Sequence, residues 1–258
     1  MLDHGRRLLR RGAAVLGVLV ASFLGAPTAG AQVAPWEDRG FLSVNFGYQV
    51  GDRAFAESTS ADIYEETATY GVTHASSGGG FFDVSGGVRV WSHLAAGLGV
   101  TTFSTRGGAA VTGSVPHPLF FNRPRTATFN FTDLEHKQTG VHFQAVWVMP
   151  ITDVIEVSVF GGPSVFMVDQ GIVTGATPTE IAAPFNVVEI ASAAIGAVSE
   201  TAVGGNVGVD VTYLVTEQLG AGIFARWAGA SVDIPATGGS QRIDVGGAQF
   251  GIGMRARF

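Results

Sequence analysis

The sequence predicts an all-β protein, a closed antiparallel up-and-down β-barrel of eight strands that crosses a membrane. Three observations lead to this fold class. The chain begins with an export signal, it carries little charge, and eight segments alternate between large apolar residues and polar or small ones. A period of two is typical of strands whose two faces meet different surroundings.

The composition excludes several classes of protein. Of the 258 residues, 46% are apolar and only 14% are charged, whereas an ordinary soluble domain has about 25% charged residues. The chain has no cysteine, so it can form neither a disulfide nor a thiolate metal site. The formal net charge is −6, so the chain lacks the basic surface that nucleic-acid binding needs. We therefore expect no cofactor and no nucleic-acid partner.

Residues 1–31 are predicted to be a cleaved signal peptide. The basic stretch MLDHGRRLLRR precedes the apolar run AAVLGVLVASFLG, which is too short to span a bilayer. The small residues Ala29-Gly30-Ala31 then suit a signal peptidase; an N-terminal membrane anchor is the alternative. Residues 32–40 would follow as a periplasmic segment, and residues 41–258 as an outer-membrane barrel domain. No later apolar run is long enough for a transmembrane helix.

The eight predicted strands have about the length that a tilted strand needs to cross a bilayer. They are residues 42–50, 82–90, 94–102, 140–149, 154–168, 205–215, 219–229 and 249–258. The closing segment QFGIGMRARF illustrates the pattern, with apolar side chains on one face and Arg255 and Arg257 on the other. We expect the apolar faces to meet lipid. A soluble barrel that binds a ligand inside would require those faces to point inward.

The connections between these strands alternate in length. Short turns are expected at residues 92–93, 150–153 and 216–218, and long loops at roughly 51–80, 106–138, 169–203 and 233–242. Short periplasmic turns, long extracellular loops and an even strand count are typical of transmembrane barrels.

Two loop segments leave alternatives open. Residues 61–75 alternate partially, so they could form an extra hairpin, and a ten-stranded barrel is the main rival. Residues 178–200 are apolar and could form a short helix, with Ile190, Ala194 and Val198 at helical spacing, or a strand extension.

Charged residues on the inward faces predict a polar network in the lumen, because an eight-stranded barrel is just wide enough for side chains to fill. Buried charges must pair with one another. The network is expected to plug the barrel; a narrow conduit for ions or small solutes is the alternative. Its predicted members are Asp83, Arg89, His142, Glu156, Asp210, Arg226, Arg255 and Arg257.

The Ala-Gly-Ala site, the eight alternating segments and the terminal QFGIGMRARF resemble the small outer-membrane barrels of the OmpA, OmpX and OmpW type. The resemblance implies that the barrel-assembly machinery recognises an insertion signal. The residues that match it are Phe250, Ile252, Met254 and Phe258. The resemblance also implies an outer-membrane location, contact with membrane lipid and lipopolysaccharide, and, for the OmpW type, a hydrophobic solute. It is architectural and assigns no activity.

The second long loop contains SVPHPLFFNRPRT, residues 114–126. Its prolines restrict the backbone, and burial of the large apolar rings of Phe120 and Phe121 away from water is favourable. They are expected to form a lid over the barrel mouth or a patch for a partner or lipid, together with His117. Arg123 and Arg125 would suit lipopolysaccharide phosphates.

No catalytic or metal-binding residue is predicted. The sequence has neither a G-x-S-x-G elbow nor an H-E-x-x-H helix, and only Asp133 and His136 suggest a weak metal pair. We expect a non-enzymatic envelope role: membrane integrity, surface contact or slow passage of a small or hydrophobic solute. The alternative is an enzyme that modifies envelope lipids. An inward Ser–His contact near the outer leaflet would favour the enzyme, and an ion-paired lumen the structural role.

Overall fold

The structure is a computed structural model that describes residues 36–51, 53–236 and 239–258. The expected signal peptide and residues 32–35 lie outside these ranges. The elements are β1 (Gly40–Val50), β2 (Arg53–Ile63), β3 (Glu66–Ser76), β4 (Gly79–Trp91), β5 (Leu94–Val115), β6 (Arg125–Pro150), β7 (Ile155–Glu180), β8 (Val188–Leu214), β9 (Leu219–Ala236) and β10 (Gly239–Arg257).

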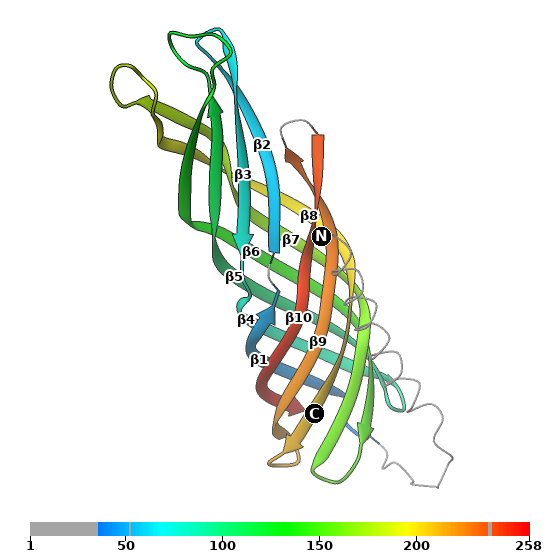
Figure 1. The fold of residues 1–258 in the computed structure, drawn as a ribbon. Coiled ribbons are helices and arrows are strands. Elements are labelled where there is room, and N and C mark those ends of the chain that lie inside the picture. The colour runs from blue at the N-terminus through cyan, green and yellow to red at the C-terminus, as the bar shows by residue number, and fades with distance from the viewer. Residues whose placement is uncertain (1–35, 52, 237–238) are drawn as a thin grey trace, which may run out of the picture. The chain divides into compact units, whose positions relative to one another are not determined.

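Eight of these strands close into a ring. β1 pairs with β4 on one side and β10 on the other, and β5 pairs with both β4 and β6 (Figure 1). The remaining ring neighbours follow chain order from β6 to β10, and every pairing is antiparallel. A closed sheet leaves no unpaired edge in lipid. The predicted eight-stranded up-and-down barrel is confirmed, and the ten-stranded alternative is wrong.

The hairpin of β2 and β3 lengthens the first hairpin of the barrel instead of adding wall strands. β2 follows β1 after residues 51–52, and β3 precedes β4 with residues 77–78 between them. β3 pairs with β5 from Thr69↔Ser114 to Ala75↔Gly108, beyond the level at which β4 pairs with β5. This extension explains the partial alternation of residues 61–75.

Most residues of the expected long loops continue the strands. The second loop shrinks to residues 116–124 between β5 and β6, and the third to residues 181–187 between β7 and β8. Residues 188–200 pair with β7, so the strand extension left open for residues 178–200 forms and the short helix does not. Cross-strand pairing satisfies this backbone, and it buries Val188 and Ile190 on one face of the strand.

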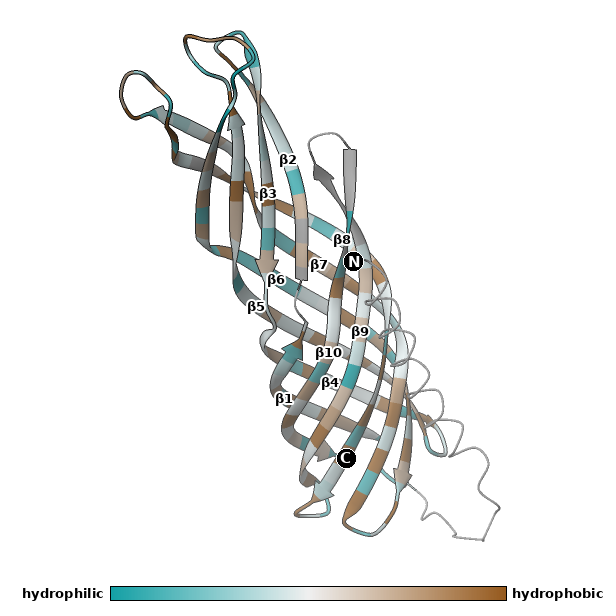
Figure 2. Ribbon diagram, in the orientation of Figure 1, coloured by the Kyte–Doolittle hydropathy of each residue, from teal (hydrophilic) through white to brown (hydrophobic). Residues whose placement is uncertain are grey.

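The outer surface of the ring carries large apolar side chains, and Figure 2 shows hydrophobic residues recurring along its strands. Large side chains such as Phe46, Ile223 and Met254 are exposed there, as the alternation predicts for a lipid-facing surface. Trp91 and Tyr213 are exposed beside the short turns, where aromatic girdles of transmembrane barrels lie. The soluble alternative, with these faces inward, is therefore wrong. In the part of the chain that the structure describes, no helix has the length and apolarity to cross a membrane.

Beyond the ring, the strands form a second, smaller structure that we call the outer extension. It comprises β2, β3 and the parts of β5–β8 within residues 106–138 and 169–203. It has a hydrophobic core of its own, separate from the lumen. Its buried members are Ala68, Tyr70, Val72, Ala109, Val111, Val115, Ala127, Leu134, Val173, Val188 and Ile190. The extracellular end is therefore built as packed β-structure.

Candidate functional site

An ion pair between Asp83 of β4 and Arg226 of β9 lies at the centre of the lumen. The two groups are 3.0 Å apart, and each side chain is only 2% exposed. Asn45 and Thr101 donate to the two carboxylate oxygens at 2.9 and 2.7 Å. Arg226 also donates to Thr101 at 2.6 Å and to Gln249 at 2.7 Å. Both charges therefore have the polar partners that a buried pair needs.

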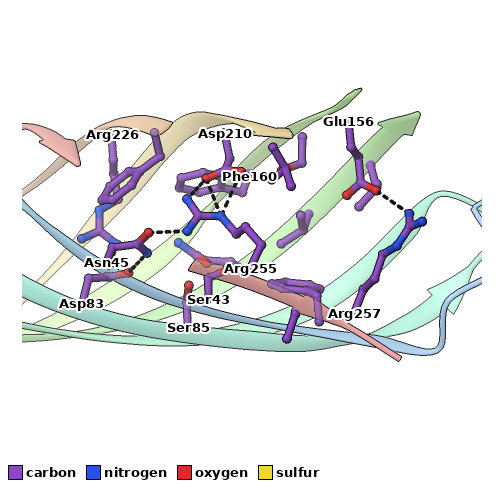
Figure 3. A pocket seen from close by; sticks show the side chains of 18 of the residues that line it. Ser43, Asn45, Asp83, Ser85, Glu156, Phe160, Asp210, Arg226, Arg255 and Arg257 are labelled. Atoms are coloured by element: carbon purple, nitrogen blue, oxygen red, sulfur yellow. Dashed lines mark hydrogen bonds and ion pairs between the residues drawn. The ribbon is translucent and has the colours of Figure 1, made fainter. Parts of the chain in front are cut away.

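A second pair, Asp210 of β8 and Arg255 of β10, lies beside the first (Figure 3). Arg255 also donates to the amide oxygen of Asn45, which links the two pairs. Thr212 donates to Asp210 at 2.8 Å. Gly222 leaves room for the guanidinium, because a Cβ there would lie 2.9 Å from its Nε. Gly222 of β9 thus accommodates the long Arg255 side chain of β10.

The periplasmic mouth is closed by a third group of residues. Arg257 lies 3.4 Å from Glu156 and 3.3 Å from Asp38. Arg89 donates to the carbonyl oxygen of Trp36, and its guanidinium lies 5.9 Å from the centre of that indole ring. The buried Trp36 packs against Ala95, Val146 and Val148.

Sequence reasoning missed Trp36, because it treated residues 32–40 as a periplasmic segment outside the barrel. The only local signal is a large aromatic residue that precedes the charged residues Glu37 and Asp38 just before the first strand.

The lumen also contains the Ser–His contact that would favour an enzyme. His142 Nδ1 lies 2.8 Å from Ser164 Oγ, and its Nε2 lies 3.1 Å from Thr101 Oγ1. Asn206 donates to Ser164 at 2.8 Å. Both His142 and Ser164 are 0% exposed, so no substrate reaches the hydroxyl. The geometry is that of a hydrogen-bonded polar core.

Aromatic rings fill the lumen next to this network. Phe81, Phe103 and Phe224 form a buried cluster, with Phe160 packed against it. An inward glycine permits such packing: a Cβ at Gly47 would lie 2.6 Å from the ring of Phe81. Phe224 lies two residues from the inward Arg226, so alternation puts both on one face, but the cluster depends on barrel geometry that the sequence does not display.

Towards the outer extension, glutamines span the lumen. Gln249 donates to Gln49 at 2.6 Å, and Gln49 donates to the carbonyl oxygen of Gly246 at 3.2 Å. The Gly246 N–H in turn donates to Gln138 at 3.2 Å. Gly246, at φ +93°, has a backbone conformation that side chains rarely adopt. These contacts add a further polar layer that sequence reasoning missed.

The space left between these layers is small. A cavity of about 60 Å³ lies among the ion pairs, and six of the predicted network residues line it: Asp83, Glu156, Asp210, Arg226, Arg255 and Arg257 (Figure 3). Each water molecule needs roughly 10–15 Å³ of such space, so the cavity has room for a few waters. Pockets for drug-sized ligands have about 300–1,000 Å³. This cavity therefore has no room for a solute of that size.

In the outer extension, Arg125 joins the two long loops. It forms an ion pair with Glu180 and donates to the carbonyl oxygens of Pro116 and Phe185, each at 2.6 Å. Tyr64, in the turn between β2 and β3, donates to Glu180 at 3.2 Å. The hydrogen bond from Arg125 lowers the pKa of Glu180 below its usual range. Arg125 is buried, so its expected place in an exposed phosphate-binding patch is wrong.

The loop of residues 116–124 does not cover the barrel mouth. Phe120 and Phe121 are 52% and 70% exposed, so the lid expectation is wrong. The strand extensions of β5 and β6 carry this loop away from the ring (Figure 1). His117 is buried, and the centre of its ring lies 4.9 Å from the centre of the Phe120 ring. The guanidinium of Arg123 lies 5.7 Å from the centre of the same Phe120 ring.

The two remaining groups of predicted residues do not form a chemical site. Phe250, Ile252, Met254 and Phe258 are all exposed on the outer surface, and their role as an insertion signal stays a prediction. His136 is buried 2.6 Å from Gln170, while Asp133 is exposed. Among the described residues, no group of three or more potential ligands could hold a metal ion.

Comparisons with known proteins give structural similarities and no activity. No protein-family model matches the chain, and no curated protein matches its sequence. Among solved structures, it is similar to Neisserial surface protein A at 14% identity, with 85% of this chain and 97% of that one covered and a TM-score of 0.38. OprG from Pseudomonas aeruginosa matches at 9% identity, with 86% of this chain and 96% of OprG covered and a TM-score of 0.43. The outer membrane protease OmpT from Escherichia coli matches at 8% identity, with 88% of this chain and 99% of OmpT covered and a TM-score of 0.36.

Proposed function

We propose that this outer-membrane barrel is a closed anchor that holds the outer extension in place for contact at the cell surface. The observation that carries the proposal is the Asp83–Arg226 pair, which is almost completely buried in the lumen. An ion that crossed the barrel would have to displace this pair. Breaking a buried pair costs about 3–5 kcal/mol, because it leaves an uncompensated charge.

The layers on either side of this pair support a closed lumen. Trp36 fills the periplasmic mouth, and a buried cluster of phenylalanines lies within the barrel. The cavity of about 60 Å³ is far smaller than a ligand pocket. These features favour a structural plug over slow passage of a solute.

The outer extension supports a role in surface contact. A strand of about 9–11 residues crosses a bilayer, whereas β7 has 26 residues and β8 has 27. More than half of each strand therefore lies outside the membrane. The extension buries its own core and is held together at its tip by the Arg125–Glu180 pair. A packed projection of this kind suits a surface that must keep its shape while it meets a partner.

Conductance tests the closed lumen. The chain purified from outer membranes is placed in planar lipid bilayers, and we expect no stable ion current. A second preparation carries Asp83→Ala and Arg226→Ala, which remove both charges of the central pair. We expect at most a small leak, because Trp36 and the phenylalanine cluster still close the lumen, and heat-modifiable gel migration checks that this variant is folded. A steady current through the unsubstituted chain would overturn the proposal.

A further inference from the structure

We propose that the tip of the outer extension binds the zwitterionic phospholipid surface of a membrane that faces the cell. The inference rests on the proposed function in surface contact, and it names the chemical class of the partner. Its two parts are apolar side chains that enter the lipid and a pair of opposite charges that meet the headgroup.

The apolar part lies on two loops at the end of the extension. Leu119, Phe120 and Phe121 are consecutive, and they are between 52% and 70% exposed. Ile181 and Val187, on the loop between β7 and β8, are 50% and 58% exposed. Both loops follow strands that continue past the ring, so the lipid of the protein's own membrane does not cover these side chains. Large apolar side chains gathered on an exposed surface mark an interaction site.

The two loops are held in a fixed relation before any partner arrives. Arg125 donates to the backbone of both, through the carbonyl oxygens of Pro116 and Phe185. The N–H of Asn122 donates to Glu66 at 3.0 Å, which ties the first loop to the hairpin of β2 and β3. Preorganisation of this kind lowers the entropic cost of binding.

Charges of both signs lie next to the apolar loop. The guanidinium of Arg123 lies 5.7 Å from the centre of the Phe120 ring, at the border of the apolar residues. In the adjoining hairpin, Glu65 of the turn is exposed, and Glu66, the first residue of β3, accepts a hydrogen bond from the Asn122 N–H. A guanidinium suits phosphate oxygens, and carboxylates attract an ammonium group. A zwitterionic headgroup contains both groups, so this arrangement favours it over a purely anionic one.

The shape of the tip favours lipid over a folded protein as the partner. The exposed apolar residues lie on two separate loops, and Figure 1 shows both loops at the end opposite the short turns. A fluid bilayer accepts apolar side chains at several points at once, and peripheral proteins bind by burying such side chains at the headgroup boundary. A rigid protein would need a matching hollow for each loop.

Vesicle flotation tests the proposal with the full chain held in lipid nanodiscs, so that the outer extension is free. The nanodiscs are mixed with phosphatidylcholine vesicles or with phosphatidylglycerol vesicles, and the protein that floats with each is measured. We expect binding to phosphatidylcholine vesicles and weaker binding to phosphatidylglycerol vesicles. Replacing both rings, in Phe120→Ser with Phe121→Ser, should weaken binding at least about tenfold, because burial of a single Phe side chain is worth that factor or more.

Two further variants separate the contributions. Arg123→Gln should weaken binding to phosphatidylcholine vesicles while leaving the apolar residues in place. Ile195→Ser is the matched control, because Ile195 is an exposed apolar residue of the outer extension away from the tip, and it should bind as the unsubstituted chain does. Heat-modifiable gel migration checks that each variant is folded.

Three outcomes would overturn the lipid partner. They are no binding by the unsubstituted chain, undiminished binding by the double serine variant, and binding to phosphatidylglycerol vesicles alone. Each is distinguishable from failure of the proposed function. If the chain carries no current in planar bilayers and does not bind vesicles, the closed anchor stands and the lipid partner is wrong. If the chain carries a steady current, the proposed function is wrong whatever the vesicle result.

Discussion

The carboxylate of Asp83 and the guanidinium of Arg226 meet 3.0 Å apart although 143 residues separate them in the chain. One lies on β4 and the other on β9, so the pair joins the N-terminal and C-terminal parts of the barrel across the lumen. Their shared partner Thr101 lies on β5. A single buried contact therefore depends on the correct register of strands that are distant in sequence.

Removal of one partner should destabilise the barrel strongly. Asp83→Ala leaves the Arg226 guanidinium buried without its carboxylate, which costs roughly 3–5 kcal/mol. Urea-induced unfolding in detergent micelles, followed by tryptophan fluorescence, measures this loss. Arg257→Ala is the comparison, because the half-buried Arg257 pairs at 3.3–3.4 Å nearer the rim and should cost only about 1 kcal/mol. Equal losses in the two variants would contradict the account of the central pair.

Trp36 should contribute to stability although it precedes the first strand. Its indole ring is buried against Ala95, Val146 and Val148. Trp36→Ala therefore leaves a cavity at the periplasmic mouth, and truncation of a buried Trp costs roughly 3–5 kcal/mol. The same unfolding experiment applies. Trp91→Ala is the control, because Trp91 is exposed on the outer surface beside a short turn and should cost less. A Trp36 variant as stable as the unsubstituted chain would show that the segment does not close the barrel.

The strands of the ring could be predicted because lipid and lumen impose a strict period of two. Alternation placed Arg255 and Arg257 on the inward face and Ile252 and Met254 on the outward face, as the structure has them. The particular pairings could not be predicted, since a periodic pattern gives the face of a residue and says nothing about the register across the lumen.

Most of the outer extension was expected to be loop, with strand extension only an alternative, for a different physical reason. Its outward face meets water, so the large contrast between lipid and lumen is lost. β-bulges also shift the pairing register between Gly107 and Ala109 and between Val173 and Gly175. Each bulge moves later side chains to the other face, and the alternation that marks a strand breaks. The sequence pattern of these parts of β5–β8 therefore indicated loops.

The tip of the outer extension should loosen at low pH. The hydrogen bond from Arg125 lowers the folded-state pKa of Glu180. A lowered carboxyl pKa contributes stability that is complete above the ordinary glutamate pKa and is lost as the pH falls through the folded-state value. Paired spin labels at Thr126→Cys and Asn186→Cys report the separation of the two loops, and the chain has no native cysteine to interfere.

We expect a narrow distance distribution between those labels at neutral pH and a broad one in acid. In the Glu180→Gln background the carboxylate is absent, so the distribution should be broad and independent of pH. Narrow distributions at every pH, in both backgrounds, would mean that the ion pair does not hold the loops together.

The Phe258 ring should matter for assembly more than for the folded barrel. Its ring is exposed on the outer surface, while its backbone bonds to Gly40, with N–O distances of 2.8 and 3.0 Å. Phe258→Ala keeps those backbone bonds and removes only the aromatic ring. If the ring is an insertion signal, this variant should reach the outer membrane at reduced levels, yet refold into detergent micelles with nearly unchanged stability. Phe258→Tyr preserves the ring and should restore normal levels. Quantitative blotting of outer-membrane fractions measures all three chains, and normal levels of Phe258→Ala would remove the insertion-signal role.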